Sequence, residues 1–264
     1  INDLDREFED VFNVSIDFHS FFKEAIQHFK MSYMFYSFLL KRIKPNQIYV
    51  VVSYAYPSLV RAAKDLDIEV TELQHGAFSK YHLGYSYNSI RNVDYFPDKF
   101  LAWNEFWRNI AALPLKKEDI GIYPFRFQVA EVEKYRKIPK IRNQVVVISQ
   151  GPIADKMCKI ILDNFDFFQD KSIKYKLHPG ELKSYKDSYF VTQLLLKDNV
   201  DLVTDDNLYE LFASSEYQVG VYSTALYEGL EFGLKTILCN TMFVEYMEEL
   251  IDLDKVYLVL DEKI

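Results

Sequence analysis

Two histidines stand in short polar motifs that follow predicted strands. His75 lies in a Gln-His-Gly motif after residues 68–73, and His178 lies in a His-Pro-Gly motif after residues 172–177. An imidazole changes its charge near neutral pH, so it can accept a proton from a hydroxyl group or hydrogen-bond a phosphate oxygen. We therefore expect His75 to act as a general base and His178 to contact a phosphate group. The alternative for each is an ordinary turn histidine.

A second kind of motif joins hydroxyl side chains to a helix start. The run 217–222 leads into Ser223 and Thr224, and Glu228 follows one turn later. The unpaired N–H groups and the dipole at a helix start attract anions, and the two hydroxyls add donors. The Glu228 carboxylate could accept hydrogen bonds from ribose hydroxyls. In the alternative interpretation, Ser223 is a plain N-cap and Glu228 an ordinary helix residue.

Gln150 and Gly151 follow the apolar run 144–149, where a glycine allows a ligand to approach the backbone. We expect both residues to lie against a bound nucleotide. The single glycine is no dinucleotide fingerprint, and the chain contains neither G-x-G-x-x-G nor G-x-x-x-x-G-K-[ST]. A dehydrogenase of the Rossmann type and a P-loop NTPase are therefore disfavoured.

The sequence around His75 holds further polar residues, namely Lys80, His82 and Tyr85. His82 could orient His75, support the loop or be exposed. Glu72 lies three residues before His75, and side chains on an extended segment alternate between two faces, so Glu72 is expected to point away from His75. Because His75 and His82 have no third ligand nearby in the sequence, we predict no metal site, and we expect no cofactor.

The composition excludes several classes of protein. The 264-residue chain is 49% hydrophobic and carries a net charge of −8, which disfavours general disorder and a broadly basic surface for nucleic acid. Cys158 and Cys239 lie in apolar surroundings and are predicted to be core thiols of a reducing compartment. No apolar run approaches the ~20 residues that span a bilayer. The chain begins at Ile1, and we expect it to be a piece of a longer protein.

The elements that must position these residues alternate between strand and helix. Residues 47–73 are predicted to form a strand–helix–strand unit of a parallel sheet, and its first strand, the apolar run 47–53, is expected to be buried on both faces. Residues 99–104 are predicted to form a further strand. A second alternation runs from residue 144 to residue 260, as in a doubly wound α/β domain. Ligands of such sheets bind beyond the carboxyl ends of the strands, which is where the four polar motifs fall.

Two segments outside these alternations complete the predicted organisation. Residues 1–44 are predicted to be helical. The segment 131–143, which is basic and contains a proline, is predicted to be a linker. Its charges are either solvated or face acidic groups. The domains are then residues 1–135 and residues 143–264. Apolar residues at three- and four-residue spacing in the N-terminal segment predict a helix face buried in a core, with a partner interface as the alternative: Phe18, Phe21, Phe22, Ala25, Ile26 and Phe29.

The order of these motifs resembles that of bacterial glycosyltransferases of the GT-B fold, which build capsule, lipopolysaccharide and teichoic-acid-like polymers. Lys176-Leu177-His178-Pro179 resembles the His-Pro motif of sialyltransferases, Kdo transferases and CDP-glycerol glycerophosphotransferases. Tyr222-Ser223-Thr224 with Glu228 resembles their Ser/Thr motif. Gln74-His75-Gly76 is similar to a histidine-glycine element of the glycerophosphotransferases. Sialyltransferases carry an acidic pair at this point, and its absence here disfavours sialic acid as the donor sugar.

The resemblance implies an α/β chain with two Rossmann-like domains whose parallel sheets face a cleft. The N-terminal domain would hold the acceptor and the C-terminal domain the donor nucleotide. His178, Ser223 and Thr224 would hold the phosphate of the donor, and His75 would be the base.

The implied activity is that of an inverting, metal-independent glycosyltransferase. It would move a sugar from a nucleotide-activated donor, with a CMP-sugar favoured, to a surface polysaccharide or glycolipid. The alternatives are a CDP-polyol phosphotransferase, a UDP-sugar epimerase, and a non-catalytic interaction domain of a polysaccharide assembly complex. The resemblance also implies a cytoplasmic protein that associates peripherally with the inner face of the cytoplasmic membrane; it implies no oligomeric state.

Overall fold

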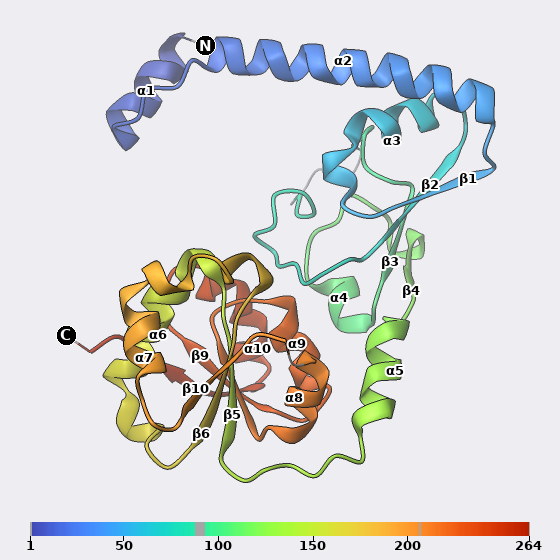
Figure 1. Ribbon diagram of the computed structural model, residues 1–264. Coiled ribbons are helices and arrows are strands. Elements are labelled where there is room, and N and C mark those ends of the chain that lie inside the picture. Colours follow the sequence, from blue (N-terminus) through green and yellow to red (C-terminus); the bar gives the residue numbers. More distant parts are fainter. Residues whose placement is uncertain (1, 88–92, 206, 264) are drawn as a thin grey trace. The chain divides into compact units, whose positions relative to one another are not determined.

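The computed structural model describes residues 2–87, 93–205 and 207–263, and the chain divides into two compact units (Figure 1). Unit 1 contains residues 1–75 and 82–123, and unit 2 contains residues 76–81 and 124–264. Each unit is built on one parallel sheet. Among the described residues, no helix has both the length and the apolar character needed to cross a membrane.

Unit 1 is organised around a four-stranded parallel sheet with the order β1-β2-β3-β4. Its core lies between this sheet and α3, where Val60, Val70 and Phe100 are fully buried. The strands are β1 (Gln47–Val50), β2 (Glu69–Leu73), β3 (Lys99–Ala102) and β4 (Ile120–Ile122). The helices are α1 (Asn2–Phe12), α2 (Phe18–Ile43), α3 (Pro57–Lys64), α4 (Glu105–Asn109) and the 3₁₀ turns η1 (Ser53–Ala55) and η2 (Lys117–Asp119).

The edge strand β1 differs from the sequence prediction, which extended it to Ser53 in the expectation of a strand buried on both faces. The strand ends at Val50, and Tyr49 is exposed. An edge strand has a neighbour on one side only, so the apolar run 47–53 is not enclosed as a central strand would be. Beyond the strand, Val52 takes a left-handed backbone conformation with a φ of 57°, which ends the extended segment and starts η1.

The N-terminal segment is helical as predicted, but the predicted burial of its aromatic face is wrong. In α2 only Leu40 is buried, whereas Phe21 is 60% exposed and Ile26 is 54% exposed. A 26-residue helix is about 39 Å long, and only the part that carries Tyr33, Tyr36 and Leu40 packs against the core next to α3. The periodicity of the sequence therefore found the helix but not the partner of its apolar face.

Unit 2 is a doubly wound α/β domain, as predicted. Its six strands are all parallel, in the order β10-β9-β8-β5-β6-β7. Read from β7, this is the order 3-2-1-4-5-6, in which the direction of winding reverses between β5 and β8. The strands are β5 (Gln144–Ile148), β6 (Ser172–Lys176), β7 (Val200–Val203), β8 (Tyr217–Gly220), β9 (Lys235–Cys239) and β10 (Val256–Leu260).

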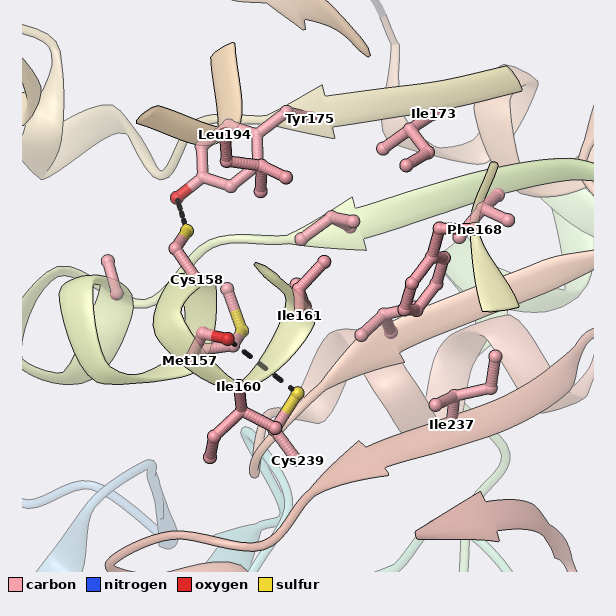
Figure 2. Close-up of a cluster of buried hydrophobic side chains, with 14 of the residues drawn as sticks. Met157, Cys158, Ile160, Ile161, Phe168, Ile173, Tyr175, Leu194, Ile237 and Cys239 are labelled. Atoms are coloured by element: carbon pink, nitrogen blue, oxygen red, sulfur yellow. Dashed lines mark hydrogen bonds between the residues drawn. The ribbon is translucent and has the colours of Figure 1, made fainter. Parts of the chain in front are cut away.

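The helices of unit 2 enclose a large apolar core (Figure 2). Met157 and Cys158 of α6 meet the sheet side chains Ile173, Tyr175 and Ile237 there, and all of these are fully buried. The helices are α5 (Arg126–Tyr135), α6 (Ala154–Asp163), α7 (Tyr189–Leu195), α8 (Leu208–Ser214), α9 (Thr224–Leu230) and α10 (Glu248–Asp252). The 3₁₀ turns are η3 (Gly151–Ile153), η4 (Phe165–Phe167), η5 (Pro179–Glu181), η6 (Tyr185–Asp187) and η7 (Val244–Met247).

The two cysteines are core thiols, as predicted. Cys158 and Cys239 are both free and fully buried. Desolvation raises the pKa of the Cys158 thiol to about 12, and burial also raises the pKa of Cys239. Figure 2 shows the Cys158 thiol facing the hydroxyl of Tyr175, 3.5 Å away.

The boundary between the units differs from the predicted one, because α5 belongs to unit 2 rather than to a first domain ending at residue 135. Its Phe127 ring packs edge-on against Tyr209 of α8, and Gln128 Nε2 donates to the carbonyl of Glu228. Residues 131–135 of the predicted linker 131–143 are therefore helical. Glu131 pairs with Lys134, and Glu133 pairs with Arg136 at the end of this helix.

Candidate functional site

Three of the predicted motifs meet at one edge of the unit 2 sheet. Since β8, β5 and β6 are adjacent and parallel, the segments that follow them emerge side by side. Two hydrogen bonds join these segments. The backbone N–H of Tyr222 donates to Gln150 Oε1 at 3.0 Å, and Ser149 Oγ donates to Glu181 Oε1 at 2.8 Å. This edge includes the point between β5 and β8 where the winding reverses, the usual ligand position in doubly wound sheets.

His178 follows β6 and is exposed, with its ring fixed by its own turn. The N–H of Gly180 donates to His178 Nδ1 at 3.1 Å, and the N–H of His178 donates to Glu181 Oε2 at 3.1 Å. A nitrogen that accepts a hydrogen bond carries no proton, so the neutral ring has its proton on Nε2. The imidazole can therefore donate from Nε2 to an anionic oxygen.

Glu181 holds this turn, and the sequence analysis gave it no role. Glu181 is 5% exposed, and its carboxylate accepts from the hydroxyl of Ser149. Further hydrogen bonds link Ser149 to Tyr175 and Tyr175 to Cys158. The signal was present in the sequence, because a capping residue followed three positions later by Glu is the spacing of a capping box. His178 and Glu181 form such a box at the start of η5.

Ser223 and Thr224 begin α9, as predicted. Ser223 Oγ accepts from the N–H of Ala225 at 3.2 Å, so the alternative of an N-cap is confirmed for Ser223. Thr224 Oγ1 accepts from the N–H of Ala77 at 2.8 Å, within unit 2. A hydroxyl that accepts one hydrogen bond keeps its own proton to donate. The segment 76–81 approaches closely here, since a Cβ on Gly76 would lie 3.1 Å from Thr224 Oγ1.

Two further predicted residues have partners inside the protein. Glu228 accepts from the hydroxyl of Tyr209 on α8 at 2.8 Å, and desolvation raises the pKa of its carboxyl group. Gly151 packs against a side chain, since a Cβ there would lie 3.3 Å from Glu181 Cγ. The helix α8, which carries Tyr209, is capped by Asn207, whose side chain accepts from the N–H of Tyr209.

His75 lies in unit 1 just after β2 and is exposed. Its Nδ1 is 3.4 Å from the hydroxyl of Tyr85, and burial of part of the ring lowers its pKa, so the imidazole is neutral near pH 7. His82 packs its ring on Tyr85, with ring centroids 4.6 Å apart. Its Nδ1 accepts from the N–H of Gly84 at 3.1 Å. Of the three predicted roles of His82, support of the loop fits these contacts best.

The predicted separation of Glu72 from His75 is wrong. Glu72 is fully buried, and its carboxylate accepts from the hydroxyl of Tyr85, the same hydroxyl that faces His75. The alternation of side chains holds only within a strand, and β2 ends at Leu73, before the chain turns at His75. Lys80 is placed elsewhere, in unit 2, where its ammonium pairs with Glu248 at 2.7 Å.

The described residues contain no group of three or more His, Cys, Asp or Glu side chains that could hold a metal ion. The polar groups at both sheet edges are instead hydrogen-bond donors and acceptors. The unit 2 edge offers donors to an anion, through His178 Nε2 and the Thr224 hydroxyl. The unit 1 edge offers a neutral imidazole backed by a buried carboxylate.

Several solved structures have a similar fold, and two of the three reported below hold a bound nucleotide sugar. A UDP-GlcNAc 2-epimerase from Methanocaldococcus jannaschii, in complex with UDP-GlcNAc and UDP, has a TM-score of 0.58 and 11% identity, over 89% of this chain and 70% of that one. A UDP-GlcNAc 2-epimerase from Neisseria meningitidis, bound to UDP-GlcNAc, has a TM-score of 0.55 and 14% identity, over 86% of this chain and 67% of that one. MurG from Acinetobacter baumannii has a TM-score of 0.55 and 8% identity, over 87% of this chain and 64% of that one.

These similarities establish the fold class, which is α/β with two parallel-sheet domains of the GT-B type, as predicted. The identities are too low to carry more than the fold. No protein-family model matches the chain, and no curated protein matches its sequence.

Proposed function

We propose that this protein is an enzyme of the GT-B fold that binds a nucleotide-activated sugar and transfers the sugar, with inversion and without a metal ion, to a glycan or glycolipid. The observation that carries the proposal is the meeting of the segments after β5, β6 and β8 at one edge of the unit 2 sheet. That edge presents the Nε2–H of His178 and the hydroxyl of Thr224 near the start of α9.

His178, Ser223 and Thr224 bind the phosphate of the donor in this proposal, and Gln150 and Gly151 line the nucleotide. Hydrogen-bond donors fixed in advance stabilise the charge that grows on a departing phosphate, and removing one such donor typically costs about 10²–10³ in rate. Gly180 and Glu181 fix the His178 ring, so little reorganisation is needed when the charge develops. Glu228, now bonded to Tyr209, is proposed to turn to the ribose hydroxyls.

His75 of unit 1 is proposed as the base that takes the proton of the attacking hydroxyl. The lowered pKa of its ring keeps the imidazole neutral and able to accept that proton. The donor is proposed to be a CMP- or CDP-activated sugar, on the motif resemblance, whereas the names of the similar structures favour UDP. Capsule or lipopolysaccharide synthesis at the cytoplasmic side of the membrane is the proposed setting.

Nucleotide binding is the direct test of this proposal. Isothermal calorimetry with CMP, CDP, UDP and GDP should give saturable binding for at least one cytidine or uridine nucleotide. His178→Ala should weaken that binding about 10- to 100-fold, because a hydrogen bond to a charged group is worth ~1.5–3 kcal/mol. The matched control is His28→Ala on the exposed surface of α2. Failure of all four nucleotides to bind would refute the proposal.

The identity of the transferred group separates the proposal from its alternatives within the fold. With the cognate donor, a glycosyltransferase forms a glycosidic bond and releases the nucleotide, whereas a CDP-polyol phosphotransferase leaves a phosphate in the product. An epimerase, which the similar structures suggest, converts the nucleotide sugar without an acceptor. Mass spectrometry of the products with and without a glycan acceptor distinguishes the three. Absence of any turnover, with a bound partner protein instead, would indicate the interaction domain.

A further inference from the structure

We propose that Glu72 and Tyr85 are positioning residues that hold His75 in the tautomer whose Nδ1 is protonated and whose Nε2 carries the free lone pair. This inference rests on the proposed function, in which His75 is the base. The hydrogen-bonded chain of Glu72, Tyr85 and His75 lies entirely within unit 1.

This series of hydrogen bonds begins at Glu72, whose carboxylate only accepts hydrogen bonds. Glu72 is fully buried, and its oxygens accept from the backbone N–H of Ser53 at 3.2 Å, from the hydroxyl of Ser53 and from the hydroxyl of Tyr85. The backbone N–H of Ser53 can only donate, so Glu72 accepts there, and the hydroxyls of Ser53 and Tyr85 are further donors to the same carboxyl group. The left-handed Val52 directly before Ser53 helps aim both groups of Ser53 at Glu72.

The donor and acceptor roles in this series then follow from the single hydroxyl proton of Tyr85. That proton is donated to Glu72, so the hydroxyl oxygen faces His75 as an acceptor. An acceptor 3.4 Å from Nδ1 requires a proton on Nδ1. The Tyr85 ring is 1% exposed and is fixed by edge contacts with Tyr54 and Phe100, so the hydroxyl cannot swing away.

A neutral ring protonated at Nδ1 leaves Nε2 as the only base. In the proposed reaction, Nε2 takes the proton of the acceptor hydroxyl while its oxygen forms the bond to the sugar carbon. The bond from that carbon to the donor phosphate breaks, and its electron pair leaves with the phosphate. The ring becomes an imidazolium, whose charge is stabilised by the buried carboxylate through Tyr85.

Two other histidines of this protein allow a comparison of tautomers. His82 Nδ1 accepts from the N–H of Gly84, and His178 Nδ1 accepts from the N–H of Gly180. Both rings are therefore expected in the opposite tautomer, with the proton on Nε2. His75 differs from them because its Nδ1 faces a hydroxyl rather than a backbone N–H.

Long-range ¹H–¹⁵N NMR of the histidine rings tests the inference without any substrate. At pH 8, above the ordinary histidine pKa of about 6.5, the wild-type protein labelled with ¹⁵N-histidine should show His75 protonated at Nδ1, and His82 and His178 protonated at Nε2. Tyr85→Phe should convert the His75 pattern to Nε2–H or to an average of the two tautomers. The matched control Tyr54→Phe removes a neighbouring phenol and should leave the His75 pattern unchanged.

An Nε2-protonated His75 in the wild-type protein would overturn the inference, and this result needs no variant to fold. An unchanged His75 pattern in folded Tyr85→Phe would overturn it too. Because neither measurement involves a nucleotide, both are independent of the binding test of the proposed function.

Kinetics provide the second readout once the donor is known. Glu72→Gln and Tyr85→Phe should lower kcat by up to about 10²-fold with little change in KM for the donor, since the donor is bound by unit 2. An altered tautomer with an unchanged kcat would overturn the positioning role and leave the proposed function standing.

Discussion

The buried carboxylate of Glu181 is predicted to set both the stability of the unit 2 edge and the position of His178. We consider Glu181→Ala, which removes the acceptor of Ser149 Oγ and of the His178 N–H. Each hydrogen bond to a charged group contributes ~1.5–3 kcal/mol. The hydroxyl of buried Ser149 would be left without this acceptor, whereas the N–H of exposed His178 could turn to water. Relief of the cost of burying the carboxylate offsets part of this loss. We expect a net destabilisation of about 3 kcal/mol.

Glu181→Gln should be milder, at about 1 kcal/mol. Its amide oxygen can accept from the His178 N–H, and its amide N–H can donate to Ser149 Oγ, which is able to accept. The matched control is Glu231→Ala on the surface of the same unit, where substitutions usually stay within about 0.5 kcal/mol. We therefore predict that the loss of stability is largest for Glu181→Ala, smaller for Glu181→Gln and smallest for the control Glu231→Ala.

Hydrogen–deuterium exchange measured by mass spectrometry localises the effect. A loss of 3 kcal/mol in the free energy of opening corresponds to about a 10²-fold drop in protection. We expect this drop in peptides covering β5, β6 and η5 for Glu181→Ala, together with weaker nucleotide binding. If Glu181→Ala retains wild-type protection there, within a factor of two or three, the structural role assigned to the buried network is refuted.

Two further predictions concern other parts of the chain. Cys158 and Cys239 should not react with a thiol reagent in the folded protein, because both thiols are buried and burial raises the pKa of each. Their modification should proceed at the rate of unfolding, and rapid labelling in native buffer would contradict their burial. The stability of unit 1 should fall as the pH drops below about 6.5, because burial lowers the pKa of His75 and His82 in the folded state, so the unfolded chain binds more protons there. The raised pKa of buried Glu72 acts with the opposite sign, its contribution being lost as the pH rises through the folded value. Urea unfolding can be followed by the fluorescence of Trp103 and Trp107, both in unit 1. The free energy of unfolding should fall between pH 7.5 and pH 5.5, and this fall should be smaller in the double variant His75→Gln, His82→Gln.

The alternation of strands and helices in unit 2 was predictable from the sequence. The apolar runs 144–149 and 217–222 end within two residues of β5 and β8, because strands that are buried on both faces are near-continuous apolar runs. The short strand β4, with the sequence Ile-Gly-Ile, and the seven-residue helix α7 were not predicted. Three residues are too few for a period. The helix α7 begins without a side-chain cap, whereas the equally short α9 was marked in the sequence by its cap at Ser223.

The sequence also placed the candidate residues at strand ends, because turns and polar motifs are local features. Its predictions about burial required contacts that are distant along the chain. The aromatic stripe of α2 indicates a core face, but burial depends on what packs against it. Tyr33, Tyr36 and Leu40 pack near α3, and Phe18 meets the ring of Phe8 from α1, while Phe21 and Ile26 stay exposed. Likewise, residues 131–135 were predicted as part of a charged linker, whereas they belong to α5, which packs on unit 2 through Phe127 and Tyr209.

The sequence by itself therefore determined the parallel α/β class, the positions of His75 and His178, and the buried thiols. Only the tertiary structure decided which nitrogen of each imidazole carries the proton. For His75 that depends on Tyr85 and Glu72, and for His178 on the turn held by Glu181 and Ser149. The physical reason is that a hydrogen bond depends on a few tenths of an ångström and on the direction of the donor. Residues up to 32 positions apart, such as Ser149 and Glu181, attain that geometry only when their strands pair.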